Sequence, residues 1–262
     1  MPQPAPARGR RVLAALLLLL LLLAVRPGAA QTPAAAVPVT IHYQQRPPYY
    51  VHEPGGEPRG LVVDPLKRVL ARAGLAPAWA LTPSQRQLLL IEQGQGPDCG
   101  LGWFRNPQRE QLGRFSAQPL YRDQPIGMLA RRGSALREGM SMREAVLQAP
   151  AELLVKTGFS YGPELDALIA ARSASRGLVS GNGDMPTLIR MLQAGRADWM
   201  PLAPEEAQVW LGSGPPAPLP AEQFQLLHFA DAPPGLGRYL YCNKAVPQSW
   251  LDRLDAALAA GG

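Results

Sequence analysis

One short motif in the 262-residue sequence has the spacing of a catalytic nucleophile. The segment G-F-S-Y-G, residues 158–162, matches the G-x-S-x-G elbow of serine hydrolases and lies between a predicted strand and a predicted helix, as that motif requires. A hydrolase also needs an acid and a histidine; the available partners are Asp184 or Asp198 and His228. Since His228 lies within an apolar strand pattern, we favour the alternative, in which the first glycine makes a tight turn and Ser160 caps the next helix.

A second candidate is Arg109, which follows the end of a predicted strand. In open α/β sheets, ligands bind beyond the carboxyl ends of the strands. A guanidinium offers two parallel donors in a fixed geometry, which suits a carboxylate. We therefore expect Arg109 to be exposed at the mouth of a cleft and to anchor a ligand. The competing interpretation is a surface arginine paired with Glu110.

Aromatic residues gather at the ends of the first and third predicted strands, namely Tyr43, Tyr49, Tyr50, Trp103 and Phe104. Such rings belong either to an ordinary core or to the wall of a ligand pocket. The pattern alone leaves both possibilities open.

The charge balance excludes several function classes. The formal charge is +6, from 26 basic and 20 acidic residues, but the first 30 residues hold four arginines and no acid. The remaining 22 basic residues nearly cancel the 20 acidic ones, so nothing favours nucleic acid. Two cysteines and three histidines in no ligand-like spacing predict no metal, and no glycine-rich cofactor motif is present.

The first 30 residues have the pattern of a signal peptide. Three arginines near the start precede an apolar run, Val12–Val25, and small residues follow up to Ala30. A membrane anchor would need about 20 apolar residues, more than this run contains. We therefore predict cleavage before Gln31 and a free, periplasmic protein with no stable membrane insertion after processing.

The rest of the sequence alternates between strand and helix patterns in two blocks of similar size. The expected strands are 37–43, 78–81, 99–104, 126–130, 153–156, 197–202, 225–229 and 239–242. The expected helices are 64–73, one starting at Ser84, 141–148, 163–171, 186–194, 204–211 and 249–260. This alternation predicts an α/β protein with parallel sheet, and the two blocks predict two lobes with a cleft between them.

Several segments in this order resemble bacterial extracellular solute-binding proteins of family 3, the amino-acid-binding type that serves ABC transporters. The segments are Arg46–Tyr50 (RPPYY), Gly60–Asp64 (GLVVD), Gly102–Glu110, Phe115–Tyr121, Val155–Gly158 (VKTG), Gly195–Asp198 (GRAD) and Tyr239–Lys244. The series spans nearly all of residues 37–262. The resemblance implies a two-lobed periplasmic-binding-protein-like fold of type II. Its first lobe would comprise residues 37–118 plus 239–262 and its second 124–234, with hinges at about 119–123 and 235–238.

The resemblance also implies a ligand site. Arg109 matches the arginine that grips a ligand carboxylate, and Gly102 matches a position whose backbone meets the ligand. Residues 156–160 match a second-lobe loop whose amides face the same carboxylate, as expected where a helix begins. The full expected set is Tyr49, Gly102, Trp103, Phe104, Arg109, Lys156, Gly158, Phe159 and Ser160.

Two positions depart from the family pattern. Many amino-acid binders carry a hydroxyl residue where this chain has Phe104, and an acid that holds the α-amino group where it has Ala203. We therefore expect a small polar solute with a carboxylate, without assigning an amino group to it. The implied protein is a monomer without catalysis or cofactor that delivers its ligand to an ABC permease. A sensory role and a hydrolase built on Ser160 are the alternatives.

In the family fold, the strands that contain Cys99 and Cys242 are antiparallel neighbours. The resemblance thus implies that the two sulfurs can approach, and an oxidising compartment would permit a disulfide. Two buried free thiols are the alternative.

Overall fold

The computed structural model describes residues 2, 38–172, 177–212, 219–220 and 222–261. The chain divides into two units, Met1–Ala36 and Val37–Gly262, and every described helix and strand belongs to the second. Apart from Pro2, the predicted signal peptide lies outside the described residues. Within the described part, no helix combines the length and the apolar character needed to cross a bilayer.

The first lobe is built on a sheet with the strand order β2-β1-β3-β11-β4, and β5 also pairs with β11. The strands are β1 (Thr40–Tyr43), β2 (Ala78–Leu81), β3 (Asp98–Trp103), β4 (Arg114–Phe115), β5 (Tyr121–Arg122) and β11 (Gly237–Cys242). β1 is parallel to β2 and β3, whereas β11 runs antiparallel to β3, β4 and β5. The predicted parallel sheet is therefore a mixed one, because a strand from the far end of the chain returns into it.

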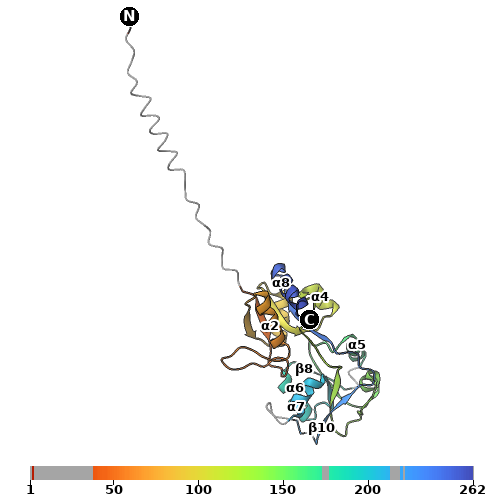
Figure 1. Ribbon diagram of the computed structural model, residues 1–262. Helices are drawn as coiled ribbons and strands as arrows, with labels where there is room; N and C mark the ends of the chain where they lie inside the picture. The colour runs from red at the N-terminus through yellow and green to blue at the C-terminus, as the bar shows by residue number, and fades with distance from the viewer. Residues whose placement is uncertain (1, 3–37, 173–176, 213–218, 221, 262) are drawn as a thin grey trace. The chain divides into compact units, whose positions relative to one another are not determined.

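Helices cover this sheet: α2 (Val63–Ala73), α3 (Ser84–Gln93), α4 (Pro107–Leu112) and α8 (Gln248–Ala259). In α2 the apolar residues recur at helical spacing and are buried, and Gly74 ends the helix in the left-handed conformation, with φ 61°. α2 and α8 pack side by side over the core (Figure 1). Helix α3 begins at Ser84, as predicted, directly after Pro83.

The two cysteines are register partners on neighbouring strands. Cys99 of β3 faces Cys242 of β11, and the structure joins them in a disulfide with an S–S distance of 1.98 Å. Both residues are fully buried in the first-lobe core. The bond therefore ties the C-terminal strand to a strand that precedes it by 143 residues.

The second lobe is built on a sheet with the order β10-β6-β9-β7-β8. Its strands are β6 (Gly127–Arg131), β7 (Leu153–Lys156), β8 (Leu178–Gly181), β9 (Trp199–Leu202) and β10 (Phe224–His228). β7 is parallel to β8 and β9, while β6 is antiparallel to β9 and β10. The sequence pattern did not predict β8, whose four residues end in Ser-Gly and carry little strand signal.

Both faces of the second sheet are buried. Leu153 and Val155 point into one apolar cluster and Leu154 into another, as alternating side chains of a strand must. The covering helices are η1 (Glu144–Gln148), α5 (Pro163–Ala171), α6 (Met185–Gln193) and α7 (Pro204–Leu211). The Glu144 amide donates to Ser141 Oγ at 3.1 Å, so the serine side chain gives a partner to one of the free amides at the start of η1.

The chain passes between the two sheets twice, from β5 to β6 and from β10 to β11. The two connections run side by side: Arg122 pairs with Gly237, and the Asp123 amide donates to Leu236 O at 2.9 Å. These contacts fall in the segments predicted as hinges, 119–123 and 235–238. The hinge role itself and the lobe boundaries stay predictions.

Candidate ligand-binding cleft

Two adjoining cavities lie between the lobes. Both cavities are lined by Arg46 and Phe104 of the first lobe, Phe159 and Ser160 of the second, and Arg238 at the start of β11. The larger of the two cavities is partly open to solvent. The smaller cavity is also lined by three of the other predicted residues, Gly102, Trp103 and Arg109. The structure thus brings six of the nine predicted site residues to one hollow, and their contact with a ligand remains a prediction.

Arg109 is positioned by the short helix that follows β3. The side chain of Asn106 caps α4 by accepting from the Arg109 amide at 2.8 Å. The guanidinium lies over the Trp103 ring, 4.7 Å from its centroid. It donates through Nη1 to Phe104 O at 2.9 Å and through Nη2 to Gly158 O, in the other lobe, at 3.0 Å.

The expectation that Arg109 is exposed was wrong. Only 6% of its surface is accessible, because α4 turns the side chain back over Trp103, and this burial lowers its pKa. The competing surface pair is absent as well: Glu110 faces Arg105, at 3.8 Å. Arg109 is therefore a desolvated cation whose partners among the described residues are carbonyl oxygens and a ring.

The turn after β7 brings second-lobe backbone to Arg109. Gly158 has φ 76°, which disfavours any side chain, and an added Cβ would lie 2.7 Å from Gln85 Nε2. Gln85 also donates to Thr157 O at 2.7 Å, so the turn is held against the first lobe. The amides of residues 156, 157 and 159 are bonded within the second lobe. Among the described residues the Gly158 and Ser160 amides have no partner, and Ser160 lines both cavities.

Ser160 has the environment of a structural residue. Its hydroxyl donates to Asp166 Oδ2 at 2.5 Å and accepts from the Gly162 amide at 3.4 Å, which closes the turn before α5. His228 is exposed on β10, with its Nδ1 3.0 Å from Glu138. Gly158 makes the predicted tight turn, but the prediction that Ser160 caps α5 was wrong, because the N-cap is Gly162 and α5 has no side-chain cap hydrogen bond. Ser160 has no histidine partner among the described residues.

The predicted aromatic residues divide between core and cleft. Trp103 donates from Nε1 to Gln87 Oε1 at 3.0 Å, and its ring meets Phe159 edge to face at 6.2 Å. Phe104 lies 4.9 Å from the Arg238 guanidinium. Tyr49 is fully buried in the first-lobe core and lines neither cavity, which corrects its place in the predicted site.

Only a glycine fits at position 102. Its φ is 74°, and an added Cβ would lie 1.8 Å from the Tyr50 hydroxyl. The same hydroxyl donates to Gly102 O at 3.3 Å. Backbone at this position therefore forms the cavity wall directly, as the prediction for Gly102 requires.

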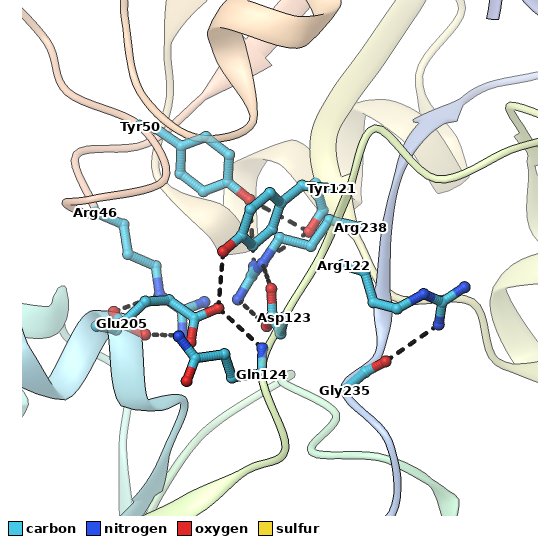
Figure 2. Close-up of polar contacts among 11 residues, drawn as sticks. Arg46, Tyr50, Tyr121, Arg122, Asp123, Gln124, Glu205, Gly235 and Arg238 are labelled. Atoms are coloured by element: carbon cyan, nitrogen blue, oxygen red, sulfur yellow. Dashed lines mark hydrogen bonds and ion pairs between the residues drawn. The ribbon is translucent and has the colours of Figure 1, made fainter. Parts of the chain in front are cut away.

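The sequence prediction missed two buried ion pairs. Arg46, in the loop after β1, donates from Nε and Nη2 to both oxygens of Glu206 in α7, each at 2.7 Å, and so joins the two lobes. Arg238 donates in the same way to both oxygens of Asp123, at 2.6 and 2.7 Å, and links the two connections (Figure 2). The motif RPPYY contains Arg46, but its partner lies 160 residues away, so no local signal could pair them.

Glu205 links helix α7 of the second lobe to the connection between β5 and β6. Its Oε1 accepts from the Tyr121 hydroxyl at 3.2 Å and from the Gln124 amide at 3.1 Å (Figure 2). Two residues earlier, Ala203 lines the larger cavity. The methyl group of Ala203 thus occupies the place where the family pattern expects an acid for an ammonium group.

Lys156 is a buried cation with one weak polar contact. Its exposed fraction is 4%, its Nζ lies 3.4 Å from Gln44 Oε1, and the same atom lies 4.4 Å from the centroid of the Phe159 ring. Burial, and next the charge of Arg46, lower its pKa to about 8, against the opposing effects of Glu206 and Asp184. Lys156 lines neither cavity, and it makes no ion pair among the described residues.

The comparisons with solved structures place this arrangement in a known fold. One similar structure is an ancestral arginine-binding protein bound to glutamine, 13% identical, with a TM-score of 0.65 over 86% of this chain and 91% of that one. An arginine transport-system periplasmic binding protein from Legionella pneumophila is 14% identical, with a TM-score of 0.65 over 86% and 93%.

A histidine kinase sensor domain with similarity to periplasmic binding proteins is 18% identical, with a TM-score of 0.64 over 86% of this chain and 89% of that one. No family model and no curated protein matches the sequence. The chain has the mixed α/β, two-lobed fold of periplasmic binding proteins, as the sequence predicted.

Proposed function

We propose that this protein is an exported, periplasmic solute-binding protein, a monomer without catalysis of its own. It captures a small polar solute with a carboxylate in the interlobe cleft and presents it to an ABC-type importer. The similar structures support a binding role, since one is the substrate binding protein of an amino acid ABC transporter. The observation that carries the proposal is Arg109, a buried cation in the wall of a hollow between the lobes.

Binding follows from the contacts that Arg109 makes. Its two terminal nitrogens donate to carbonyl oxygens of the two lobes, at 2.9 and 3.0 Å. A carboxylate is a stronger acceptor for a guanidinium than a carbonyl oxygen, so it would displace one or both of these contacts. The unpartnered Ser160 amide would face the same anion from the second lobe. Because donors of both lobes meet one anion, the ligand would favour the closed arrangement.

A thermal-shift screen of small carboxylates and amino acids tests the proposal. A solute that binds only the native protein raises the apparent stability by mass action, by about 2.7 kcal/mol at a hundredfold excess over Kd. We expect at least one carboxylate to raise the Tm in a concentration-dependent manner. Absence of a shift with every carboxylate and amino acid would contradict the proposal.

Arg109 is tested by substitution on the folded protein. Arg109→Ala should weaken binding of the solute found in the screen by about 2–5 kcal/mol, the cost of losing a desolvated charged pair. Arg109→Lys should restore part of the loss, since it retains the charge without the second parallel donor. The matched control is Arg59→Ala, because the Arg59 side chain is 64% exposed and pairs on the surface with Glu53.

A sensory role is the second candidate, favoured by the similarity to the histidine kinase sensor domain. The two roles share the cleft and differ in what the liganded protein contacts. Uptake of the radiolabelled solute by cells that lack the gene separates them. Lost uptake supports the importer, whereas normal uptake with a lost transcriptional response to the solute supports the sensor.

A further inference from the structure

The smaller and the larger cavity share part of their wall, and Arg109 is one hydrogen bond away from it. Its Nη1 donates to Phe104 O at 2.9 Å, and Phe104 lines both cavities. Ser160, whose amide has no partner among the described residues, lines both as well. A carboxylate held by Arg109 and this amide therefore has the larger cavity beside it, beyond Phe104 and Phe159.

Most of the wall of the larger cavity is apolar. Besides the shared residues, strand β9 and the two connections supply three prolines and the side chains of Leu202, Ala203, Ile126 and Leu236. Phe104, Phe159, Ile126 and Leu236 are only half-buried, so part of their apolar surface is still in contact with water. Phe104, Phe159 and Leu236 also belong to none of the apolar clusters formed by the described residues. Neither lobe has packed them into its core, which leaves them free to contact a solute.

The charged side chains in this wall have partners within the protein. Arg238 donates to both oxygens of Asp123, at 2.6 and 2.7 Å. Arg46 donates to both oxygens of Glu206, each at 2.7 Å. These pairs are bidentate, the geometry in which a guanidinium and a carboxylate bind each other most strongly.

The uncharged polar side chains in the wall are three. The Ser160 hydroxyl donates to Asp166, and the Tyr161 hydroxyl accepts from the Lys156 amide at 2.7 Å. Gln124, the third, is exposed to solvent. An amide or hydroxyl of a solute in this cavity would lose water beside apolar side chains and would have to displace contacts that are already made.

We propose that the solute carries an apolar group, alkyl or aromatic, at the end away from its carboxylate, and that this group lies in the larger cavity. The inference rests on the proposed function and narrows its solute class. The apolar group covers the half-buried side chains of Phe104, Phe159 and Leu236 and removes them from water, which is the usual source of affinity in a ligand pocket. The inference concerns the part of the solute beyond the carboxylate and holds with or without an amino group.

Calorimetric titration with solutes matched in shape tests the proposal. Asparagine has a carboxamide where leucine has an isopropyl group, and succinamate and 4-methylpentanoate are the same pair without the amino group. We expect the apolar member of a pair to bind at least about tenfold more tightly than the amide. Valine with threonine, and methionine with glutamine, extend the comparison to shorter and longer chains, so that a mismatch in length does not hide the preference.

Leu236→Asn shows whether the larger cavity sets this preference. The substitution places an amide of similar shape in the wall, so the ratio of the affinities for the apolar solute and its amide should fall at least about threefold. The Leu236 carbonyl, which accepts from the Asp123 amide at 2.9 Å, is unchanged by it. The matched control is Leu226→Asn, since Leu226 is also half-buried but lines neither cavity. A ratio measured within one protein does not depend on the fraction that is folded.

The outcomes separate the inference from the proposed function. If the amide or hydroxyl member of each pair binds as tightly as its apolar partner, the inference is overturned and the solute-binding function stands. An unchanged ratio in Leu236→Asn, or an equal fall in Leu226→Asn, overturns it as well. If no carboxylate and no amino acid binds, the proposed function fails together with the inference.

Discussion

The interlobe ion pair of Arg46 and Glu206 permits a quantitative test of how the cleft is held together. Glu206→Gln removes the negative charge and keeps the shape, so the Arg46 guanidinium stays buried, 9% exposed, without its counter-charge. Removal of one partner of a buried pair costs about 3–5 kcal/mol, because the other charge is left uncompensated. For a protein of this size, such a loss lowers the Tm by about 6–20 °C.

Urea denaturation followed by circular dichroism measures the loss, with Glu53→Gln as the control. Glu53 makes the same kind of contact with Arg59, at 2.6 Å, but the two side chains are 47% and 64% exposed, so the cost should stay below about 1 kcal/mol. The double replacement Arg46→Met with Glu206→Leu should recover most of the stability, since an apolar pair needs no compensation. Equal, small losses in Glu206→Gln and Glu53→Gln would refute the reasoning.

Two further predictions concern the disulfide and export. Reduction of the Cys99–Cys242 bond, which closes a loop of 143 residues, should lower the free energy of unfolding by about 2–5 kcal/mol. Thiol titration of the denatured, unreduced protein should find no free thiol. Two free thiols would show that the bond does not form. Intact-mass measurement of periplasmic protein should give a chain that starts at Gln31, and a full-length, membrane-bound product would overturn the export prediction.

Local patterns predicted most elements, and the reasons are visible in the structure. The predicted helix 163–171 agrees at both ends with α5, because Pro163 fixes its start and the apolar pattern ends at Ala171. The strand 153–156 is an unbroken apolar run before a lysine, and it is β7. In contrast, the direction of β11 depends on strands more than 100 residues away, so alternation alone could not predict the mixed sheets.

The position of a single segment at the candidate site could be predicted from the sequence. The contacts between segments that are distant in the chain could not. The segment Gly102–Arg109 contains the end of β3 and the residues that follow it, so its place at the cleft could be predicted from the general rule for α/β sheets. The burial of Arg109 results from its packing on Trp103 and from the second-lobe carbonyl of Gly158, which are tertiary contacts. The pairing of Arg46 with Glu206 likewise depends on the approach of two lobes, for which a single sequence holds no signal.

Calorimetric titration of the unmodified protein and of Arg109→Ala shows whether Arg109 holds a carboxylate in the cleft. The titrant is the carboxylate that gives the largest thermal shift in the screen, and both proteins are measured at a temperature where they remain folded. We expect saturable binding to one site in the unmodified protein and a loss of at least about 30-fold in affinity in the variant, equivalent to about 2 kcal/mol. The same affinity in both proteins would contradict the claim that Arg109 holds a carboxylate in the cleft.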